Sequence, residues 1–130
     1  MRTLHWKGEI GGVPHIEASP AVCFDFDGVL HEYKPPWKGD PALIEGSPIV
    51  GAKDFVDWCS IRGFWVFVHS VRNATEEGRE AVESWLARND IHVDMVCAYK
   101  PLAEFYVDDR AVRFENNWGK IMGELTNGRN

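Results

Sequence analysis

The sequence feature that most constrains the fold is a short apolar segment that ends in two carboxylates. Residues 21–24 are all apolar, and Asp25, Phe26, Asp27 and Gly28 follow them directly. A continuous apolar run is typical of a strand that is buried on both faces. Because a buried, unpaired carboxylate costs several kcal/mol, we expect the strand to end here at the rim of a sheet. The two Asp side chains are two residues apart, so they point to the same side of the sheet.

The rest of the chain alternates short apolar runs with segments of helical periodicity. Strands that are apolar throughout and alternate with helices indicate a parallel sheet covered on both faces. We therefore expect a three-layer, Rossmann-like α/β fold, with one domain over residues 1–130 because this length suits a single core. The predicted strands are 21–27, 64–68, 93–98, 105–107 and 112–114. The first predicted helix starts at Pro48 and ends at Gly63. The second starts at the capping pair Asn73 and Glu76 and runs to Asn89, and the third runs from Trp118 to Leu125.

Two segments lie outside this alternation. Residues 1–20 alternate weakly and contain several Gly and Pro, which predicts an N-terminal hairpin or an edge extension. Residues 28–47, called the flap below, are also rich in Gly and Pro and predict a loop or short hairpin beside the end of the first strand. The flap carries Tyr33 and Trp37, and the pattern leaves open whether they contact a substrate or rest on the protein surface.

Charge and cysteine content exclude several classes of protein. The net charge is −6 and Lys and Arg form no run, so nucleic acid is expected only as a substrate. The cysteines Cys23, Cys59 and Cys97 lie far apart in apolar segments, which predicts buried free thiols in a reducing compartment. The longest apolar run, 64–68, is too short to cross a bilayer, and the N-terminus does not resemble a signal peptide. We therefore expect a cytoplasmic protein with no membrane association.

Polar residues follow four of the predicted strands. In a parallel sheet, ligands bind outside the carboxyl ends of the strands. Ser70, Lys100, Asp108 and Asp109 follow later strands and therefore join the first two carboxylates at one edge. The negative charges of these acids repel one another, and a bound divalent cation would neutralise them. Mg²⁺ is the cation expected, because it prefers oxygen ligands. Together with an ammonium and a hydroxyl group, the cation would bind a phosphoryl group.

These four segments resemble those of haloacid dehalogenase (HAD) superfamily phosphohydrolases. The matching pieces are 24–30, 68–70, 100–101 and 106–109, in the order that the family has them. The resemblance implies that Asp25 is the nucleophile and forms an aspartyl-phosphate. It also implies that Asp27 protonates the leaving group and then activates water, and that Ser70 and Lys100 hold the phosphoryl oxygens; the hydroxyl of Ser70 replaces that of the commoner Thr.

The same resemblance implies a Mg²⁺ site. Asp25, Asp108 and the backbone carbonyl of Asp27 would bind the ion, with Asp109 acting directly or through a neighbouring ligand. Gly28 would form the turn into the flap.

Candidate substrate contacts are Gly28, Arg72 and Arg110. The two arginines resemble those of polynucleotide 3′-phosphatase relatives, and each is equally consistent with an ordinary surface ion pair. Residues 28–47 have room only for a hairpin, and 71–100 only for a helix and a strand, so no cap domain is expected. An open site of this kind suits a larger substrate, such as a nucleic-acid end, a phosphoprotein or a phosphosugar, and makes a homodimer a candidate arrangement.

The sequence thus predicts a Mg²⁺-dependent phosphomonoester hydrolase. The alternatives are a non-catalytic module that binds phosphate or Mg²⁺ and, less favoured, a phosphotransferase. A response-regulator receiver domain is disfavoured, because its acidic pair follows the first strand and its phosphorylated Asp follows the third. His69, beside Ser70, is interpreted as a strand-end residue that points into or along the sheet.

Overall fold

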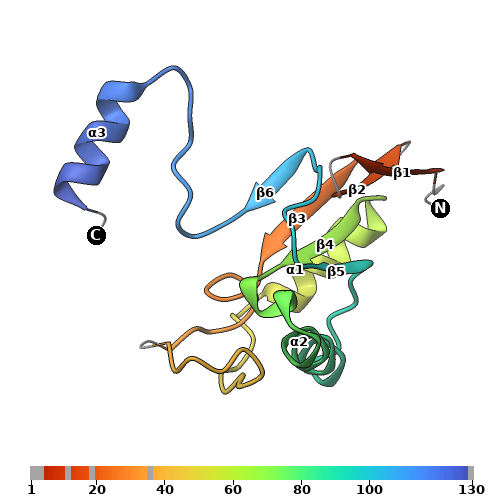
Figure 1. Ribbon diagram of the computed structural model, residues 1–130. Helices are drawn as coiled ribbons and strands as arrows, with labels where there is room; N and C mark the ends of the chain where they lie inside the picture. Colours follow the sequence, from red (N-terminus) through yellow and green to blue (C-terminus); the bar gives the residue numbers. More distant parts are fainter. Residues whose placement is uncertain (1–4, 11–12, 18–19, 35–36, 129–130) are drawn as a thin grey trace.

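The computed structural model describes residues 5–10, 13–17, 20–34 and 37–128, with side chains from residue 20 onward. Its centre is a four-stranded sheet in the order β5-β4-β3-β6 (Figure 1). All three neighbouring pairs are parallel. The strands are β3 (Ala21–Asp25), β4 (Trp65–His69), β5 (Met95–Cys97) and β6 (Phe105–Val107). The α/β class and the parallel, Rossmann-like sheet expected from the sequence are confirmed.

Two helices cover one face of this sheet. Helix α1 (Ala52–Ile61) connects β3 to β4, and α2 (Glu76–Arg88) connects β4 to β5. Both connections step across the sheet in the same direction, so right-handed crossovers place both helices on the same face. Their apolar residues share one buried cluster with the strands: Val22, Phe24, Phe26, Leu30, Ala52, Val56, Cys59, Val66, Val68, Val82, Trp85, Leu86 and Ile91.

The opposite face carries a smaller cluster. It is formed by Ala21, Cys23, Phe67 and Cys97, and Ala103 from the connection between β5 and β6 packs against it. This connection joins the two outer strands of the sheet. No helix of the described part of the chain contributes to this cluster, so the third layer expected from the sequence is here a connecting segment.

The cysteines are buried free thiols, as expected. Burial raises the pKa of Cys23 to about 12 and that of Cys97 to about 11. Both side chains therefore stay protonated and act as small apolar groups in the second cluster.

Two predicted helix starts are wrong. Helix α1 begins at Ala52, after Gly51 in a left-handed conformation (φ 89°), whereas Pro48 forms a bridge with His31. Helix α2 is capped by Thr75, whose hydroxyl accepts the N–H of Gly78.

Asn73, the predicted cap, lies instead in the 3₁₀ helix η1 (Val71–Ala74) and donates its amide N–H to the carbonyl of Cys97 at 2.8 Å. The predicted end of the first helix is correct, since Gly63 follows it with φ 89°. The fifth strand predicted at 112–114 is wrong, because these residues have no regular structure.

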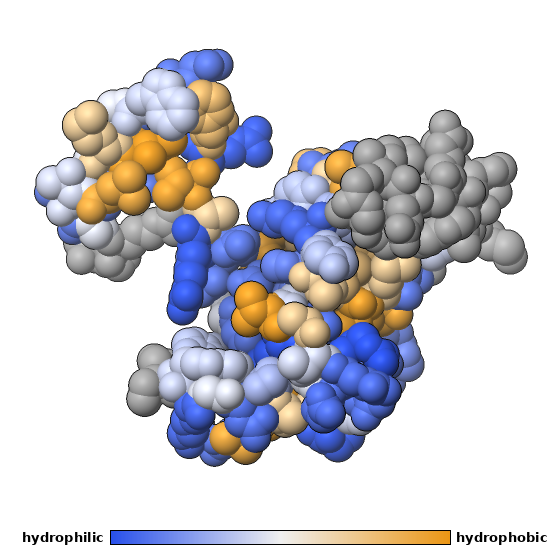
Figure 2. All heavy atoms as spheres, in the orientation of Figure 1, coloured by the Kyte–Doolittle hydropathy of each residue, from blue (hydrophilic) through white to orange (hydrophobic). Residues whose placement is uncertain are grey.

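The remaining elements lie outside the sheet. Strands β1 (His5–Ile10) and β2 (Val13–Glu17) pair antiparallel with each other in a separate two-stranded sheet. Helix α3 (Trp118–Asn127) stands away from the sheet in Figure 1. None of its residues is buried, and its apolar side chains form an orange group in Figure 2. In the described ranges no helix combines the length and apolar character needed to span a membrane.

Candidate active site

Three carboxylates converge where β3 and β6 end. Asp25 is the last residue of β3, and Asp108 and Asp109 follow β6, its direct neighbour in the sheet. Each of the three offers an oxygen atom, and these atoms lie within 4.8 Å of one another. Parallel pairing of β3 with β6 is what brings residues so distant in the sequence to one edge. Three oxygen donors at this spacing are a ligand set that suits Mg²⁺.

The crowding of negative charge changes the acidity of Asp25. Burial, together with the nearby charge of Asp108, raises the pKa of Asp25 from 3.8 to about 6. The charges of Asp109 and Asp27 act in the same direction, and a hydrogen bond from the backbone N–H of Phe26 opposes them. Asp25 is therefore the carboxylate that gains most from a nearby cation.

Asp27 has a different environment from Asp25. Its Oδ1 lies 2.9 Å from Nδ1 of His31, and its Oδ2 accepts Nε–H of Arg72 at 2.9 Å. The N–H of Gly46 donates to Nε2 of His31, so the ring proton sits on Nδ1 and points at Asp27. Burial alone would raise the pKa of Asp27, but the hydrogen bonds from His31 and Arg72 outweigh it and the pKa is lowered. Asp27 is thus held as a carboxylate and is not part of the three-carboxylate group.

Arg72 is a buried charge with its partners inside the protein. Its side chain is 3% exposed, and besides Asp27 it donates from Nη1 to the carbonyls of Pro41 and Leu43, both at 2.9 Å. The ring of Trp37 covers the guanidinium, with its centroid 4.8 Å from Cζ. The sequence made Arg72 a candidate substrate contact; the structure instead makes it the link between the flap and Asp27.

Ser70 and His69 follow each other at the end of β4. Ser70 is buried, and its Oγ accepts the N–H of Arg72 at 3.1 Å, so it caps η1. His69 pairs in register with Asp25 and is half-buried. Burial and the nearby charge of Lys100 lower the pKa of His69, which favours its neutral form. The sequence predicted that His69 points into or along the sheet. In the structure His69 lines two hollows beside Asp25, so it also faces the site.

Lys100 lies at the same edge of the sheet. It is exposed, and its Nζ stands 4.8 Å from the ring centroid of Tyr106. A small hollow of about 10 Å³ joins Lys100 to Asp25, Asp108 and His69. The structure therefore brings the predicted lysine next to the predicted nucleophile.

Gly28 and Arg110 flank the carboxylates. Gly28 has φ 87°, and a Cβ atom there would stand 2.5 Å from Oδ2 of Asp109. Glycine is thus required both by the backbone conformation and by the close approach of Asp109. Arg110 is exposed, and its N–H donates to Oδ1 of Asp108 at 2.7 Å.

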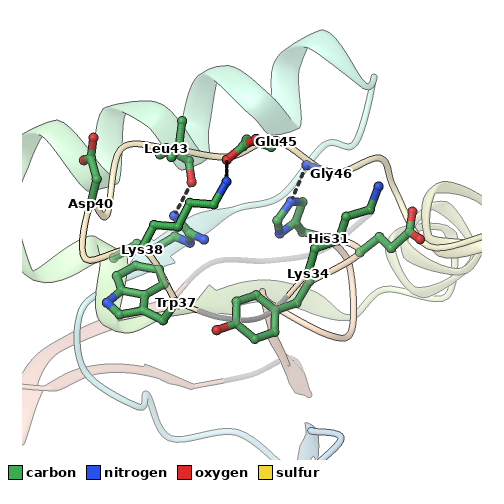
Figure 3. A pocket seen from close by; sticks show the side chains of 11 residues that line it. His31, Lys34, Trp37, Lys38, Asp40, Leu43, Glu45 and Gly46 are labelled. Carbon is green, nitrogen blue, oxygen red and sulfur yellow. Dashed lines mark hydrogen bonds and ion pairs between the residues drawn. The ribbon is translucent and has the colours of Figure 1, made fainter.

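Besides the small hollow at Lys100, two more hollows open on this side of the molecule. The larger, about 350 Å³, is lined by Asp25, Asp27, Tyr33, Trp37, His69, Ser70, Val71 and Arg110. The smaller, about 170 Å³, lies within the flap, and Figure 3 shows Lys38 reaching toward Glu45 and His31 toward Gly46 around it. The larger hollow contains the candidate nucleophile, so it is the candidate active site.

His31 is a residue of this site that the sequence marks only weakly. It is 3% exposed, stacks on Phe26 and bonds to Asp27. A signal was present in the spacing, because His31 follows Asp27 by four residues across a turn that begins with Gly28. The partnership with Arg72 had no such local signal.

Comparisons with known proteins identify a shared fold. The sequence matches no family model and no curated protein. A chain from a structure of the Pnkp1/Rnl/Hen1 RNA repair complex is similar to this one with TM-score 0.52 and 22% identity, over 87% of this chain and 33% of that one. A chain from another structure of the Pnkp1/Rnl/Hen1 complex gives TM-score 0.49 and 20% identity, over 87% of this chain and 36% of that one. The protein therefore spans about a third of the length of these chains, and what the first of them shares with it is the α/β fold.

Proposed function

We propose that this protein is a Mg²⁺-dependent phosphomonoester hydrolase, a HAD-like domain without a cap. The observation that carries the proposal is the convergence of Asp25, Asp108 and Asp109 within 4.8 Å beside Lys100 and Ser70. The donor set fits Mg²⁺, because all three donors are carboxylate oxygens that lie within 4.8 Å of one another. Bound there, Mg²⁺ would supply charge neutralisation for the carboxylates and the phosphoryl oxygens.

In the first step the carboxylate of Asp25 attacks phosphorus, and the bond from phosphorus to the leaving oxygen breaks. Lys100 is placed to hold a phosphoryl oxygen, because it shares a hollow with Asp25. The hydroxyl of Ser70 accepts a backbone hydrogen bond, so its own hydrogen is left to donate to a second phosphoryl oxygen. The product is an aspartyl-phosphate on Asp25 and an alkoxide that needs a proton.

In the second step water attacks phosphorus, the bond from phosphorus to the oxygen of Asp25 breaks and releases phosphate, and Asp27 accepts a proton from the water. The bonds from His31 and Arg72 favour the carboxylate form of Asp27, which suits this role as a base. Delivery of a proton to the leaving group in the first step requires the protonated form, which these bonds disfavour. The protonated fraction of Asp27 therefore supplies this proton in the first step, and the carboxylate left behind accepts a proton from water in the second, so that the protons balance over one turnover.

A substrate screen tests the proposal. The panel contains nucleotides, 3′-phosphorylated RNA and DNA oligonucleotides, phosphosugars and phosphopeptides, each with Mg²⁺ and with EDTA. The RNA ends are included because a structural neighbour belongs to an RNA repair complex. Turnover should need Mg²⁺ and disappear in Asp25→Asn, while Asp54→Asn, an exposed carboxylate on α1, keeps it.

Two outcomes would contradict the mechanism. Turnover by the Asp25→Asn protein would exclude an aspartyl-phosphate at this residue. Mg²⁺ binding without turnover of any ester in the panel would favour the alternative, a module that binds Mg²⁺ or phosphate without catalysis.

A further inference from the structure

Two residues of the flap form a wall shared by both hollows. Tyr33 and Trp37 line the larger hollow, which contains Asp25, and also the smaller hollow within the flap. The mechanism proposed above uses neither side chain. Aromatic rings that line both a reaction site and the hollow next to it are placed to contact the leaving group of a substrate.

Trp37 is held in position although half of it is exposed. Trp37 is 46% exposed, while Arg72 beneath it is buried and bonded to Asp27, Pro41 and Leu43. The guanidinium lies 4.8 Å from the centroid of the indole and occupies one of its faces. An indole that rests on a buried, fixed cation offers its surroundings a preorganised flat surface.

We propose that Trp37 and Tyr33 bind the base of a nucleoside phosphate whose phosphate is hydrolysed at Asp25. This inference rests on the proposed function, and it names the substrate class for the same site. Stacking of bases on aromatic side chains is tolerant of sequence, because every base has a flat π-face. The protein has a net charge of −6, so stacking supplies the binding that a basic groove supplies elsewhere.

Arg72 also connects this surface to the carboxylates. Its Nε–H donates to Asp27 at 2.9 Å, and its Cζ lies 4.8 Å from the centroid of the indole. One side chain therefore holds both the stacking surface and Asp27, and Trp37 and Asp27 line the hollow that contains Asp25.

The smaller hollow is suited to one flat ring. Its volume of about 170 Å³ compares with roughly 150 Å³ for a cavity that accepts benzene. Its rim carries Lys34 and Lys38, and each ammonium can donate to the edge of a base, since Lys38 keeps donors beyond its bond to Glu45. Arg110, exposed at the larger hollow, adds a positive charge where further phosphates of an oligonucleotide would pass.

The test compares substrates with and without a base in variants of one side chain. The substrates are nucleoside 3′-monophosphates, an oligonucleotide with a 3′-phosphate, glycerol phosphate and p-nitrophenyl phosphate. Trp37→Ala should lower the ratio of kcat/KM for the nucleoside esters to kcat/KM for glycerol phosphate roughly tenfold, mainly through KM. Trp37→Phe should restore most of this ratio, because it keeps an aromatic face.

Trp58→Ala is the matched control. Trp58 on α1 is also 46% exposed, and Arg62 lies 4.9 Å from its ring centroid, but it lines neither hollow. This variant should leave the ratio unchanged. A Trp37→Ala protein that loses activity equally on all four esters would show that Trp37 only supports Arg72, and would overturn the proposal. A ratio that does not change would overturn it as well.

Binding to the Asp25→Asn protein separates this inference from the proposed function. Calorimetry with a nucleoside 3′-monophosphate and with glycerol phosphate measures the base contribution without hydrolysis. Weaker nucleotide binding in Trp37→Ala would support the base site even if no ester is hydrolysed by the wild-type protein. Hydrolysis in which the base has no effect on KM or on binding would retain the phosphatase and reject the base site. Comparison of the mononucleotide with the oligonucleotide shows whether the base belongs to a free nucleotide or to a chain end.

Discussion

Removal of the charge of Asp25 should stabilise the protein when no metal is bound. Burial and the charge of Asp108 raise the pKa of Asp25 from 3.8 to about 6. The native state therefore holds a proton on Asp25 more tightly than the unfolded chain does. The stability that this proton provides is complete below pH 3.8 and is lost as the pH rises through about 6. Asp25→Asn avoids this loss, so the variant should be the more stable protein above pH 6.

The expected gain follows from the size of the pKa shift. A rise from 3.8 to about 6 corresponds to about 3 kcal/mol at ~1.36 kcal/mol per pKa unit. Asp25 is only partly buried, so solvent screening reduces the gain in unfolding free energy to about 1–2 kcal/mol. For a chain of this size, that gain raises the Tm by roughly 3–8 °C. The gain should vanish near pH 4, where Asp25 of the native wild-type protein is protonated as well.

Thermal and urea unfolding in EDTA at pH 4 and pH 8 measure the effect. Asp54→Asn, in the first turn of α1, is the control and should bring no gain in stability. Addition of Mg²⁺ at pH 8 should stabilise the wild-type protein by mass action and leave Asp25→Asn nearly unchanged. If Asp25→Asn is no more stable than wild type at pH 8 in EDTA, the carboxylates do not repel one another and the cluster is not as described.

Three further predictions concern the surroundings of these carboxylates. Gly28→Ala should lower the unfolding free energy by about 1–2 kcal/mol, because its backbone is left-handed. The new methyl group should also displace Asp109 and so weaken Mg²⁺ binding in a titration. Gly39→Ala is the control, because Gly39 has φ 82° and no neighbour within 4 Å and should show the backbone cost alone. Arg72→Met should lower the unfolding free energy, measured in urea, by about 3–5 kcal/mol, because it leaves Asp27 and two flap carbonyls without their buried partner. A loss below about 1 kcal/mol, which is typical of a surface ion pair, would contradict this prediction. Chelation with EDTA should abolish turnover, and Mg²⁺ should restore it more fully than Ca²⁺, because the larger ion takes more ligands.

The sheet and its polar edge could be predicted because local signals agreed with the final fold. The apolar run before Asp25 and the one before Ser70 are β3 and β4, and both acquire their polar neighbours where the strand ends. The parallel arrangement followed from the alternation of strands with helices. The meeting of Asp25 with Asp108 is a consequence of that arrangement.

The features that could not be predicted from the sequence depend on contacts between residues that are far apart in the chain. Asn73 has the right spacing from Glu76 to cap a helix, but a carbonyl 24 residues away takes its amide and Thr75 caps α2 instead. The sequence left Arg72 open between a substrate contact and an ordinary surface ion pair. Its carboxylate partner, Asp27, is 45 residues away, and no periodicity in the sequence links the two.

The bond pattern of Arg72 also limits how the flap can be exchanged or redesigned. One guanidinium binds the carboxylate of Asp27 and the main-chain oxygens of Pro41 and Leu43. A loop grafted in place of residues 28–47 must bring two carbonyls to the same points in space, whatever its side chains are. Otherwise the graft changes the surroundings of Asp27 along with the loop, so that the sequence of the loop and the ionisation of Asp27 cannot be varied independently in this scaffold.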